Sequence, residues 1–426
     1  MALLGPVVAQ PATTAPAAIS TANIRFVMPP MRCSMTAPRI GYDRWMLKAG
    51  LVGSGFVARI HVEALRRVAE PIAVFSPTPA RREAFAAEHA VAPVGSLAEL
   101  IDAVDVVHVC APASTHEEVA VAALSAGVHV VVEKPFTGYF GAATTPHRQM
   151  LEAATGSAGR MVAADRASAA TLCYAENFVY APAVQREAEI VRKTDAQILR
   201  MVGEESHSGS HSPFYGMWRH MGGGSLIGKG CHPLTAMLYL KRLEGITRLG
   251  TPILPATATA RVHELTRLPT YRDAGHLRTD YDDIEDFAML HVTFDDGTVG
   301  DVFASEVVLG GVINYVEVHA NNHRTRCNLN PIDALETFNP VGARLDDVYV
   351  VEKIETKEGW SKPAPDEDWM HGYPAEIEEF YRSIGAGERP DSDAELGYAT
   401  VATIYAGYVS AEERGAEVEV PSFVEG

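Results

Sequence analysis

Beyond residue 45 the chain alternates short apolar runs with stretches in which apolar residues recur at helical spacing. The runs lie at residues 48–52, 72–76, 105–110 and 128–132. They lack the polar alternation of a strand that faces water on one side, as expected for strands covered on both faces. This order predicts βαβ units that build a parallel sheet.

The pattern changes after residues 138–170, where Gly, Ala, Thr and Ser surround one predicted helix at about 148–154. Strand-like segments then follow one another closely, at residues 197–203, 256–263, 286–294, 298–308 and 315–320. Hairpin signals such as Asp295-Asp296-Gly297 join them. Helical patterns at 373–383 and 394–411 complete the chain. This half predicts an α+β domain on a mostly antiparallel sheet.

A glycine-rich turn follows the first predicted strand, with the spacing Gly53-x-Gly55-x-x-Ala58. Gly53 permits a tight turn, Gly55 lets the backbone approach a pyrophosphate, and Ala58 is small enough for the helix to pack on the strand. The helix begins near Phe56 and Val57, and its N-terminal amides would bind the phosphates. We therefore expect a nicotinamide dinucleotide here.

The predicted fold is α/β, with two domains after a disordered extension at residues 1–45. Residues 46–175 form an N-terminal Rossmann domain with a doubly wound parallel sheet. Residues 176–426 form a C-terminal α+β domain with an open, mostly antiparallel sheet, for substrate binding and oligomerisation. The composition of residues 1–45, rich in Ala, Pro and Thr, is also compatible with an over-long gene start or a functional arm.

The choice between NAD and NADP stays open in the sequence. The second predicted strand ends at Ser76, where a site specific for NAD usually carries Asp or Glu to hold the ribose hydroxyls. The next turn holds Arg81 and Arg82, which would tolerate a 2′-phosphate. We expect NAD, with NADP as the alternative.

Charge and cysteine content narrow the class of protein. The 54 acidic residues outnumber the 36 Lys and Arg residues, for a formal net charge of -18. This balance argues against nucleic acid or an anionic membrane as partner, and no apolar run is long enough to span a bilayer. The 5 cysteines are far apart and lack a CxxC pair, which indicates a reducing cytoplasm. A small-molecule partner fits better.

Several motifs together resemble the Gfo/Idh/MocA family of NAD(P)-dependent oxidoreductases, which act on sugars. They are APASTH at 111–116, EKP at 133–135, Trp218-Arg219, the glycine-rich segment 222–232 that ends in His232, and Glu285-Asp286. The resemblance implies a carbohydrate substrate and a homodimer or homotetramer. It also implies that the turns after two strands contact the cofactor, through Ala111, Pro112, Thr115, His116, Glu133 and Lys134.

Hydride transfer from a carbinol carbon needs a base for the hydroxyl proton and a donor for the developing alkoxide. Lys134 ends a parallel strand at the edge where open α/β sheets place ligands. Its ammonium can donate to a hydroxyl or, if burial lowers its pKa, its amine can accept the proton. His232 is the second candidate, because imidazole titrates near neutrality. We expect both residues in the proton relay.

The chain departs from the family at two positions beside His232. Ordinary dehydrogenases of the family carry an Asp four residues before the histidine, where this chain has Gly228, and often an Asp three residues after it, where this chain has Thr235. The lost carboxylate favours two further hypotheses. In the first, the protein is an NAD-dependent glycosidase that oxidises the sugar, eliminates the aglycone, adds water and reduces the product, without net NADH. In the second, it is a ligand sensor without turnover.

Other candidates complete the predicted site. Tyr180 and Lys229 are possible acids or anion contacts, and Lys229 with Trp218-Arg219 could bind an anionic glycoside such as a sulfoquinovoside. Asn177, after a strand at the domain junction, could touch the nicotinamide. His207 and His211 could ligate zinc, but their Gly/Ser spacing favours a substrate-facing loop, and we predict no metal.

Overall fold

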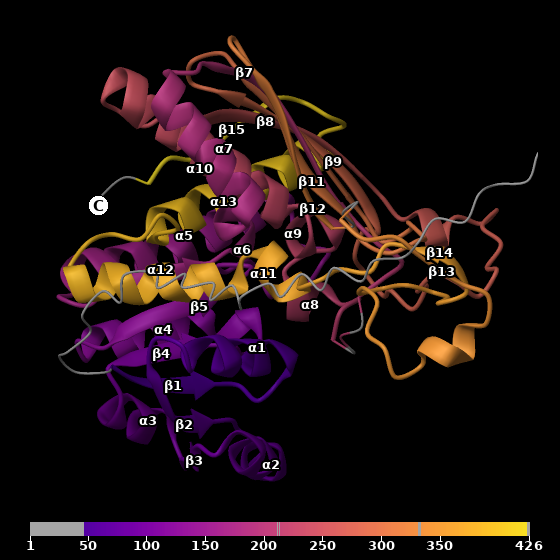
Figure 1. The fold of residues 1–426 in the computed structure, drawn as a ribbon. Coiled ribbons are helices and arrows are strands. Elements are labelled where there is room, and N and C mark those ends of the chain that lie inside the picture. Colours follow the sequence, from indigo (N-terminus) through magenta and orange to yellow (C-terminus); the bar gives the residue numbers. More distant parts are fainter. Residues whose placement is uncertain (1–46, 211, 213, 331–333, 424–426) are drawn as a thin grey trace, which may run out of the picture. The chain divides into compact units, whose positions relative to one another are not determined.

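A computed structural model describes residues 47–210, 212, 214–330 and 334–423 of the 426-residue chain. Its first sheet has six parallel strands in the order β3-β2-β1-β4-β5-β6 (Figure 1). The elements of this half are β1 (Lys48–Val52), α1 (Phe56–Leu65), β2 (Glu70–Phe75), α2 (Pro79–His89), β3 (Ala92–Pro93), α3 (Leu97–Ala103), β4 (Val106–Val109), η1 (Ala113–Thr115), α4 (His116–Ser125), β5 (His129–Glu133), α5 (His147–Ala167) and β6 (Leu172–Ala175). The predicted parallel sheet is confirmed.

The strands of this sheet are apolar because helices cover both of its faces. β4 and β6 are buried along their whole length, and β1 from its second residue onward. Helix α5 is longer than the helix predicted at 148–154, since its 21 residues include Gly156 and Gly159, which weaken a helical signal. Met150, Ala154, Ala158 and Met161 nevertheless bury one side of it.

The second sheet has seven strands in the order β12-β11-β7-β10-β9-β8-β15, and only the β7–β10 pair is parallel. The elements of this half are α6 (Asn177–Tyr180), α7 (Pro182–Thr194), β7 (Ile198–Ser206), α8 (Trp218–Met221), α9 (Ser225–Gly228), α10 (Cys231–Leu249), β8 (Pro255–His263), η2 (Leu265–Arg267), β9 (Phe287–Phe294), β10 (Val299–Ser305), β11 (Ile313–Ala320), β12 (Arg324–Asn330), β13 (Thr337–Asn339), η3 (Gly342–Leu345), β14 (Gly359–Ser361), α11 (Glu367–His371), α12 (Tyr373–Ala386), α13 (Ala394–Glu412) and β15 (Val418–Glu419). The predicted mostly antiparallel sheet is also confirmed.

The last two long helices connect the two sheets. Helix α13 contacts α5 of the first half and β8 of the second, and α12 contacts α1. The backbone of Cys173 in β6 forms an isolated antiparallel β-bridge with Asp393, the residue that caps α13. The described residues therefore cluster as one compact unit, and the predicted boundary at residue 175 stays a prediction.

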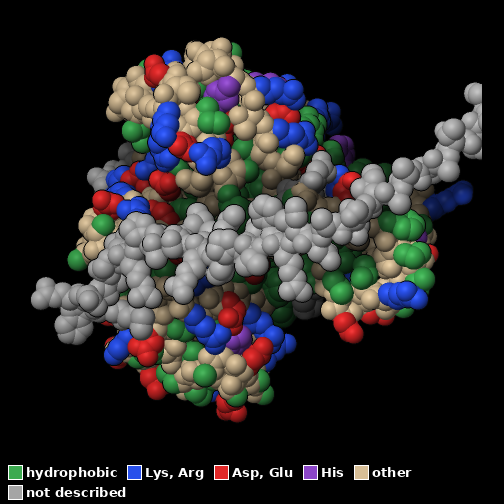
Figure 2. Space-filling model, viewed as in Figure 1, with side chains coloured by type: hydrophobic (Ala, Val, Ile, Leu, Met, Phe, Trp, Pro, Cys, Tyr) green, Lys and Arg blue, Asp and Glu red, His purple; other side chains and the backbone are tan. Residues whose placement is uncertain are grey.

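Two predictions concern membranes and the N-terminus. Within the described ranges no helix is long and apolar enough to cross a bilayer. The predicted extension at 1–45 lies outside the described residues, so its disorder stays a prediction. On the face shown in Figure 2, the described Lys and Arg side chains are interspersed with Asp and Glu.

Candidate active site

The turn between β1 and α1 has the geometry that a bound pyrophosphate requires. Gly53 has φ +113, and a Cβ there would collide with the carbonyl oxygen of Cys110, the residue directly after β4. A Cβ on Gly55 would meet nothing within 4 Å, so the backbone is open to a ligand in front of α1. Ala58 is fully buried against β1. These residues fit a dinucleotide as predicted.

A pocket of about 460 Å³ continues from this turn along the surface beside β2. It is lined by Ser54, Gly55, Phe56, Arg59, Arg81, Ala84 and Phe85. Ser76 is buried, and its hydroxyl accepts a hydrogen bond of 3.2 Å from Ser54. Since the lining includes two arginines and no carboxylate, the NADP alternative stays a prediction.

The turn after β4 is tied to the turn after β5 by His116, which is fully buried. Its Nε2 lies 3.1 Å from the carbonyl oxygen of Ala111, and its Nδ1 lies 3.1 Å from that of Pro135. Pro112 and Thr115 lie in the same turn, joined by a hydrogen bond of 2.8 Å. His116, predicted as a cofactor contact, thus connects two backbone turns, because its ring is enclosed by them.

Glu133, also predicted as a cofactor contact, is buried beneath Lys134. Its Oε1 lies 2.8 Å from Nε2 of His61, and its Oε2 accepts a bond of 3.1 Å from the Lys134 amide. His61 continues to His108 over 2.8 Å and His108 to the Tyr381 hydroxyl over 3.0 Å. Both oxygens of Glu133 thus have partners within the protein, and its role as a cofactor contact stays a prediction. Sequence reasoning did not find this chain of histidines.

Strand register brings two candidate groups together. β5 and β6 are parallel neighbours, and Glu133 pairs with Ala175. Lys134 and Glu176, the next residue of each strand, therefore lie side by side at the carboxyl edge of the sheet, where ligands of open α/β sheets bind. Lys134 is partly exposed, and among the described residues its ammonium forms no ion pair. It is available to a ligand.

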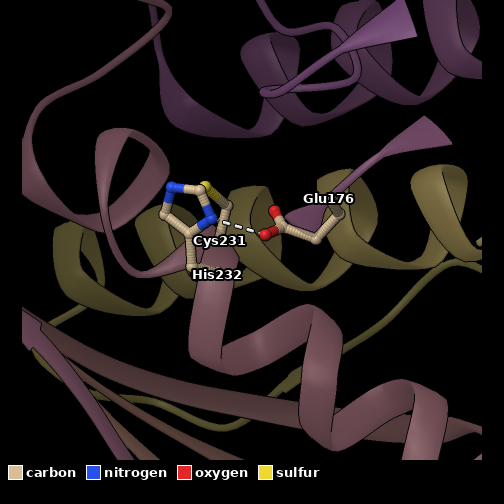
Figure 3. Close-up of side chains that lie close together, drawn as sticks. All are labelled: Glu176, Cys231 and His232. Atoms are coloured by element: carbon tan, nitrogen blue, oxygen red, sulfur yellow. Dashed lines mark hydrogen bonds and ion pairs between the residues drawn. The ribbon is translucent and has the colours of Figure 1, made fainter. Parts of the chain in front are cut away.

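His232 lies at the start of α10 and points its Nδ1 at Glu176, with which it forms a hydrogen bond (Figure 3). The ring stacks on Phe178, with centroids 4.9 Å apart. The other nitrogen, Nε2, lies 3.8 Å from Oε2 of Glu205 on β7. His232 is 4% exposed and Glu176 is fully buried. The imidazole is thus held between two carboxylates.

Burial and neighbouring charges determine which of these groups carry protons. Burial lowers the pKa of His232 to about 4 and raises the pKa of Glu176 to about 8. Burial also opposes the charge of Lys134, but the surrounding Cys231, Glu205, Glu133 and Glu176 outweigh it and raise the pKa of Lys134 above 10.5. The raised pKa favours the ammonium form of Lys134, and so the donor role over that of a neutral base.

Gly228 does not leave His232 without a carboxylate, contrary to the interpretation of the sequence. A Cβ at Gly228 would lie 2.7 Å from the hydroxyl of Tyr215, so an aspartate has no room there. Glu176 takes the place of that partner from the end of β6. Thr235, the second departure, is buried, and its hydroxyl bonds the Cys231 carbonyl and the Thr400 hydroxyl.

Lys229 is 2% exposed and forms an ion pair with Glu306, directly after β10. The hydroxyls of Tyr215 and Tyr281 also donate to Glu306, the latter over 3.3 Å. Burial lowers the pKa of Lys229, so its charge depends on this carboxylate. The prediction that Lys229 holds an anionic substrate is therefore corrected: its partner is a residue of the protein.

Trp218 and Arg219 do not join the group around His232. The Trp218 indole donates to the Tyr139 carbonyl over 3.1 Å and stacks with His147 at 5.8 Å. Arg219 is exposed, and its guanidinium donates to Sδ of Met217 over 3.3 Å and to Nε2 of His220 over 3.4 Å. Helix α8, which carries both, contacts η1 of the cofactor turn. Trp218 packs the junction, since its one donor is taken.

Three further predicted residues have partners elsewhere. Tyr180 donates to Glu379 over 3.0 Å and accepts from the Ser392 amide over 2.9 Å, so its hydroxyl is engaged away from His232 and does not support the predicted acid role. Asn177 donates to the His371 carbonyl over 2.9 Å. His207 is 8% exposed, and its Nδ1 accepts from the Gly209 amide. A substrate-facing role for His207 stays a prediction.

One group of side chains could hold a metal ion. Glu176, Cys231 and His232 place a carboxylate oxygen, a sulfur and a ring nitrogen within 4.8 Å of one another (Figure 3). Burial raises the pKa of the Cys231 thiol well above 9, and Nδ1 of His232 already bonds Glu176. The donor set is thus occupied by an internal hydrogen bond. His211, of the pair considered for zinc, lies outside the described residues.

The first part of the chain matches a known family. Residues 47–164 match the model of the GFO_IDH_MocA proteins, described as an oxidoreductase family with an NAD-binding Rossmann fold. The chain carries the NAD-binding domain of the Gfo/Idh/MocA oxidoreductases. The predicted resemblance and the predicted NAD cofactor are confirmed.

Individual relatives extend this family assignment. The UDP-N-acetylglucosamine 3-dehydrogenase of Acidithiobacillus ferrooxidans is 35% identical over 91 residues, which are 21% of this chain and 29% of that protein. The crystal structure of GenD2 from gentamicin A biosynthesis, in complex with NAD, is 25% identical with a TM-score of 0.73, over 90% of this chain and 99% of GenD2. The myo-inositol 2-dehydrogenase of Lactobacillus plantarum shares the fold, with 17% identity and a TM-score of 0.64 over 88% and 100% of the two chains.

Proposed function

We propose that this Gfo/Idh/MocA protein is an NAD-dependent dehydrogenase that oxidises a ring hydroxyl of a sugar or cyclitol to a ketone. The observation that carries the proposal is the position of His232, held by Glu176 beside Lys134 at the carboxyl edge of the NAD-binding sheet. The dehydrogenase names of the relatives support the same reaction.

When bound at the turn from Gly53 to Ala58, NAD would supply the hydride acceptor for the carbinol carbon. His232 takes the hydroxyl proton on Nε2, while Nδ1–H donates to the Glu176 carboxylate, which keeps the ring oriented. The Lys134 ammonium donates to the developing alkoxide and stabilises its charge. Phe178 stacks on the imidazole and limits its rotation. The three polar groups thus divide the work: Glu176 orients, His232 accepts and Lys134 stabilises.

The NAD-dependent glycosidase was favoured in the sequence by the missing aspartate and by Lys229 as an anion contact. Glu176 supplies the missing carboxylate, and Glu306 engages Lys229. Both reasons are therefore removed, and an anionic glycoside such as a sulfoquinovoside would meet carboxylates instead of a free Lys229. We propose net oxidation as the function.

The test uses the full chain with NAD and a panel of free sugars, cyclitols and aryl glycosides. NADH absorbance and aglycone release are followed together. We expect NADH to accumulate with a free sugar or cyclitol, and His232→Asn to abolish it. His291→Asn, whose side chain is 41% exposed on the second sheet, is the matched control and should retain activity. Aglycone release without NADH would instead establish the glycosidase.

We also propose that the protein assembles as a homodimer or homotetramer. The small sheet of β13 and β14 exposes Phe338 and Trp360 by 56% and 75%, and such exposed aromatic side chains are typical of interfaces. Light scattering on the purified chain would measure the mass. Phe338→Ser with Trp360→Ser should then dissociate the assembly if these strands form the contact.

A further inference from the structure

We propose that the substrate is a cationic amino sugar or aminocyclitol, whose ammonium group is bound by Glu205. The inference rests on the proposed dehydrogenase function and names the substrate class of the same site. It follows from polar atoms around His232 that are buried without a hydrogen-bond partner, and from the way in which the nearby cations are already used.

Strand geometry places Glu205 in the site. A Cβ on Gly203 would lie 2.7 Å from Met237 and Pro233 of α10, so this face of β7 points toward α10. Side chains alternate along a strand, and Glu205, two residues later, points the same way. Its Oε2 lies 3.8 Å from Nε2 of His232, the nitrogen that faces the substrate in the proposed reaction. Glu205 is therefore next to the reacting hydroxyl.

The carboxylate of Glu205 lacks a partner where one is needed. Its Oε2 is buried and accepts no hydrogen bond. Asn314 pairs with Glu205 across β7 and β11, and its Oδ1 is also buried without a partner, in a residue that is 4% exposed. Glu176, fully buried, has an unpartnered Oε2. These three acceptor oxygens need donors from outside the protein chain, from a ligand or from water, because a buried acceptor without a donor is costly.

The charge of the neighbourhood selects an ammonium over a hydroxyl. Lys229, which directly follows α9, is buried and forms an ion pair with Glu306. Lys134 forms no ion pair among the described residues and serves the reacting oxygen. Among the described residues no Lys or Arg nitrogen forms an ion pair with Glu205, although Lys134 and Lys229 lie near enough to favour its charged form. A ligand ammonium supplies both the charge and up to three donors.

The same arrangement disfavours anionic sugars. A sulfonate or carboxylate group would have to lie beside the Glu205 carboxylate in a site where Lys229 is already paired with Glu306. Like charges within a buried site repel strongly, since the surrounding dielectric constant is low. We therefore expect the order cationic, then neutral, then anionic for sugars that otherwise match.

The test compares kcat/KM for NADH formation with glucosamine, kanosamine, glucose, N-acetylglucosamine and glucuronate. The wild-type protein should prefer an amino sugar over glucose by about 10–100-fold, the range of a charge-assisted hydrogen bond. Glu205→Gln should abolish most of that preference, measured as the ratio of kcat/KM for the amino sugar to kcat/KM for glucose within the same variant. Glu204→Gln, on the opposite face of the same strand, is the matched control and should keep the preference.

Binding calorimetry in the presence of NAD separates the two proposals. NADH formation from neutral sugars at rates equal to those from amino sugars would overturn the inference and leave the dehydrogenase intact. An unchanged preference in Glu205→Gln, with an unchanged melting temperature, would also overturn it. Glu205-dependent binding of amino sugars without NADH from any compound would instead overturn the proposed dehydrogenase.

Discussion

Glu205 on β7 and Glu306, directly after the neighbouring strand β10, lie at the same end of one sheet, but their side chains have different numbers of partners. Ser305 pairs with Ser206, so the two carboxylates are close in register. Glu306 receives Lys229, Tyr215 and Tyr281. Oε2 of Glu205 receives no donor. The comparison teaches that a carboxylate with several partners in the protein supports the structure. A carboxylate oxygen without a donor at the same edge is available to a ligand.

Removal of Lys229, the cation that pairs with Glu306, should have the largest effect on stability. Lys229→Met leaves Glu306 buried with an uncompensated charge, and we expect the free energy of unfolding to fall by about 3–5 kcal/mol. Denaturant unfolding measures the change. Lys193→Met, which removes an exposed ion pair with Glu189, is the control and should change stability by under about 1 kcal/mol.

The double variant Lys229→Met with Glu306→Gln sharpens this prediction. A glutamine carries no charge, and Tyr215 and Tyr281 still donate to it. The double variant should therefore recover most of the lost stability. If it remained as unstable as Lys229→Met alone, the loss would come from packing and not from the unpaired carboxylate.

Lys134→Met tests the proposed role of the Lys134 ammonium, which lies on the same side of the site as Glu205. We expect kcat/KM for oxidation to fall by about 10²–10³-fold, as for loss of one donor to a developing oxyanion. NAD affinity, measured by calorimetry, should change little, because the phosphate turn at Gly53 and Gly55 is distant in sequence and built by other strands. Wild-type turnover in this variant would remove Lys134 from the mechanism.

The pH dependence tests the carboxylate that holds His232. The folded pKa of Glu176 is about 8, so near pH 7 the carboxyl is protonated and His232 accepts its proton on Nδ1. Above that value the carboxylate accepts from Nδ1, and Nε2 becomes free to act as the base. Oxidation should therefore rise about tenfold per pH unit below pH 8 and level off above it. In Glu176→Gln this rise should disappear.

Glu205→Gln should have the smallest effect on stability, with the opposite sign to Lys229→Met. Burial raises the pKa of Glu205 in the folded protein above 4.5, so the ionised form is destabilising once the pH exceeds the unfolded value. We expect a gain of about 1 kcal/mol at pH 7 that vanishes below pH 4.5. A loss of stability at pH 7 would show that Glu205 has a donor within the protein.

The sequence pattern predicted the NAD-binding half well because the features that define this half are formed by residues close together in the sequence. Each strand of a parallel sheet is a short apolar run, and the turn from Gly53 to Ala58 lies within one βα unit. Lys134 was found in the same way, because the end of a strand at the ligand edge follows from the order of the strands. His232 was found from its glycine-rich lead-in, where a Cβ on Gly224 would collide with Glu285.

The substrate half depends on contacts between distant segments. Glu176 and His232 are 56 residues apart, and Lys229 and Glu306 are 77 apart. No spacing rule connects such residues. The sequence therefore favoured Lys229 as a contact for an anionic substrate, and Gly228 as the loss of the carboxylate partner of His232. Only the packing of α10 on β7 and the ends of β6 and β10 shows which charges are balanced.

The sequence by itself thus determined the sheet that binds NAD, the phosphate turn and two residues of the candidate site, Lys134 and His232. Short-range periodicity and turn chemistry are sufficient for these features. The tertiary structure alone decided the carboxylate neighbours of Lys134, the partner of His232 and the lack of a hydrogen bond to Oε2 of Glu205. These depend on burial and on charges brought together across strands, and neither quantity exists until the chain has folded.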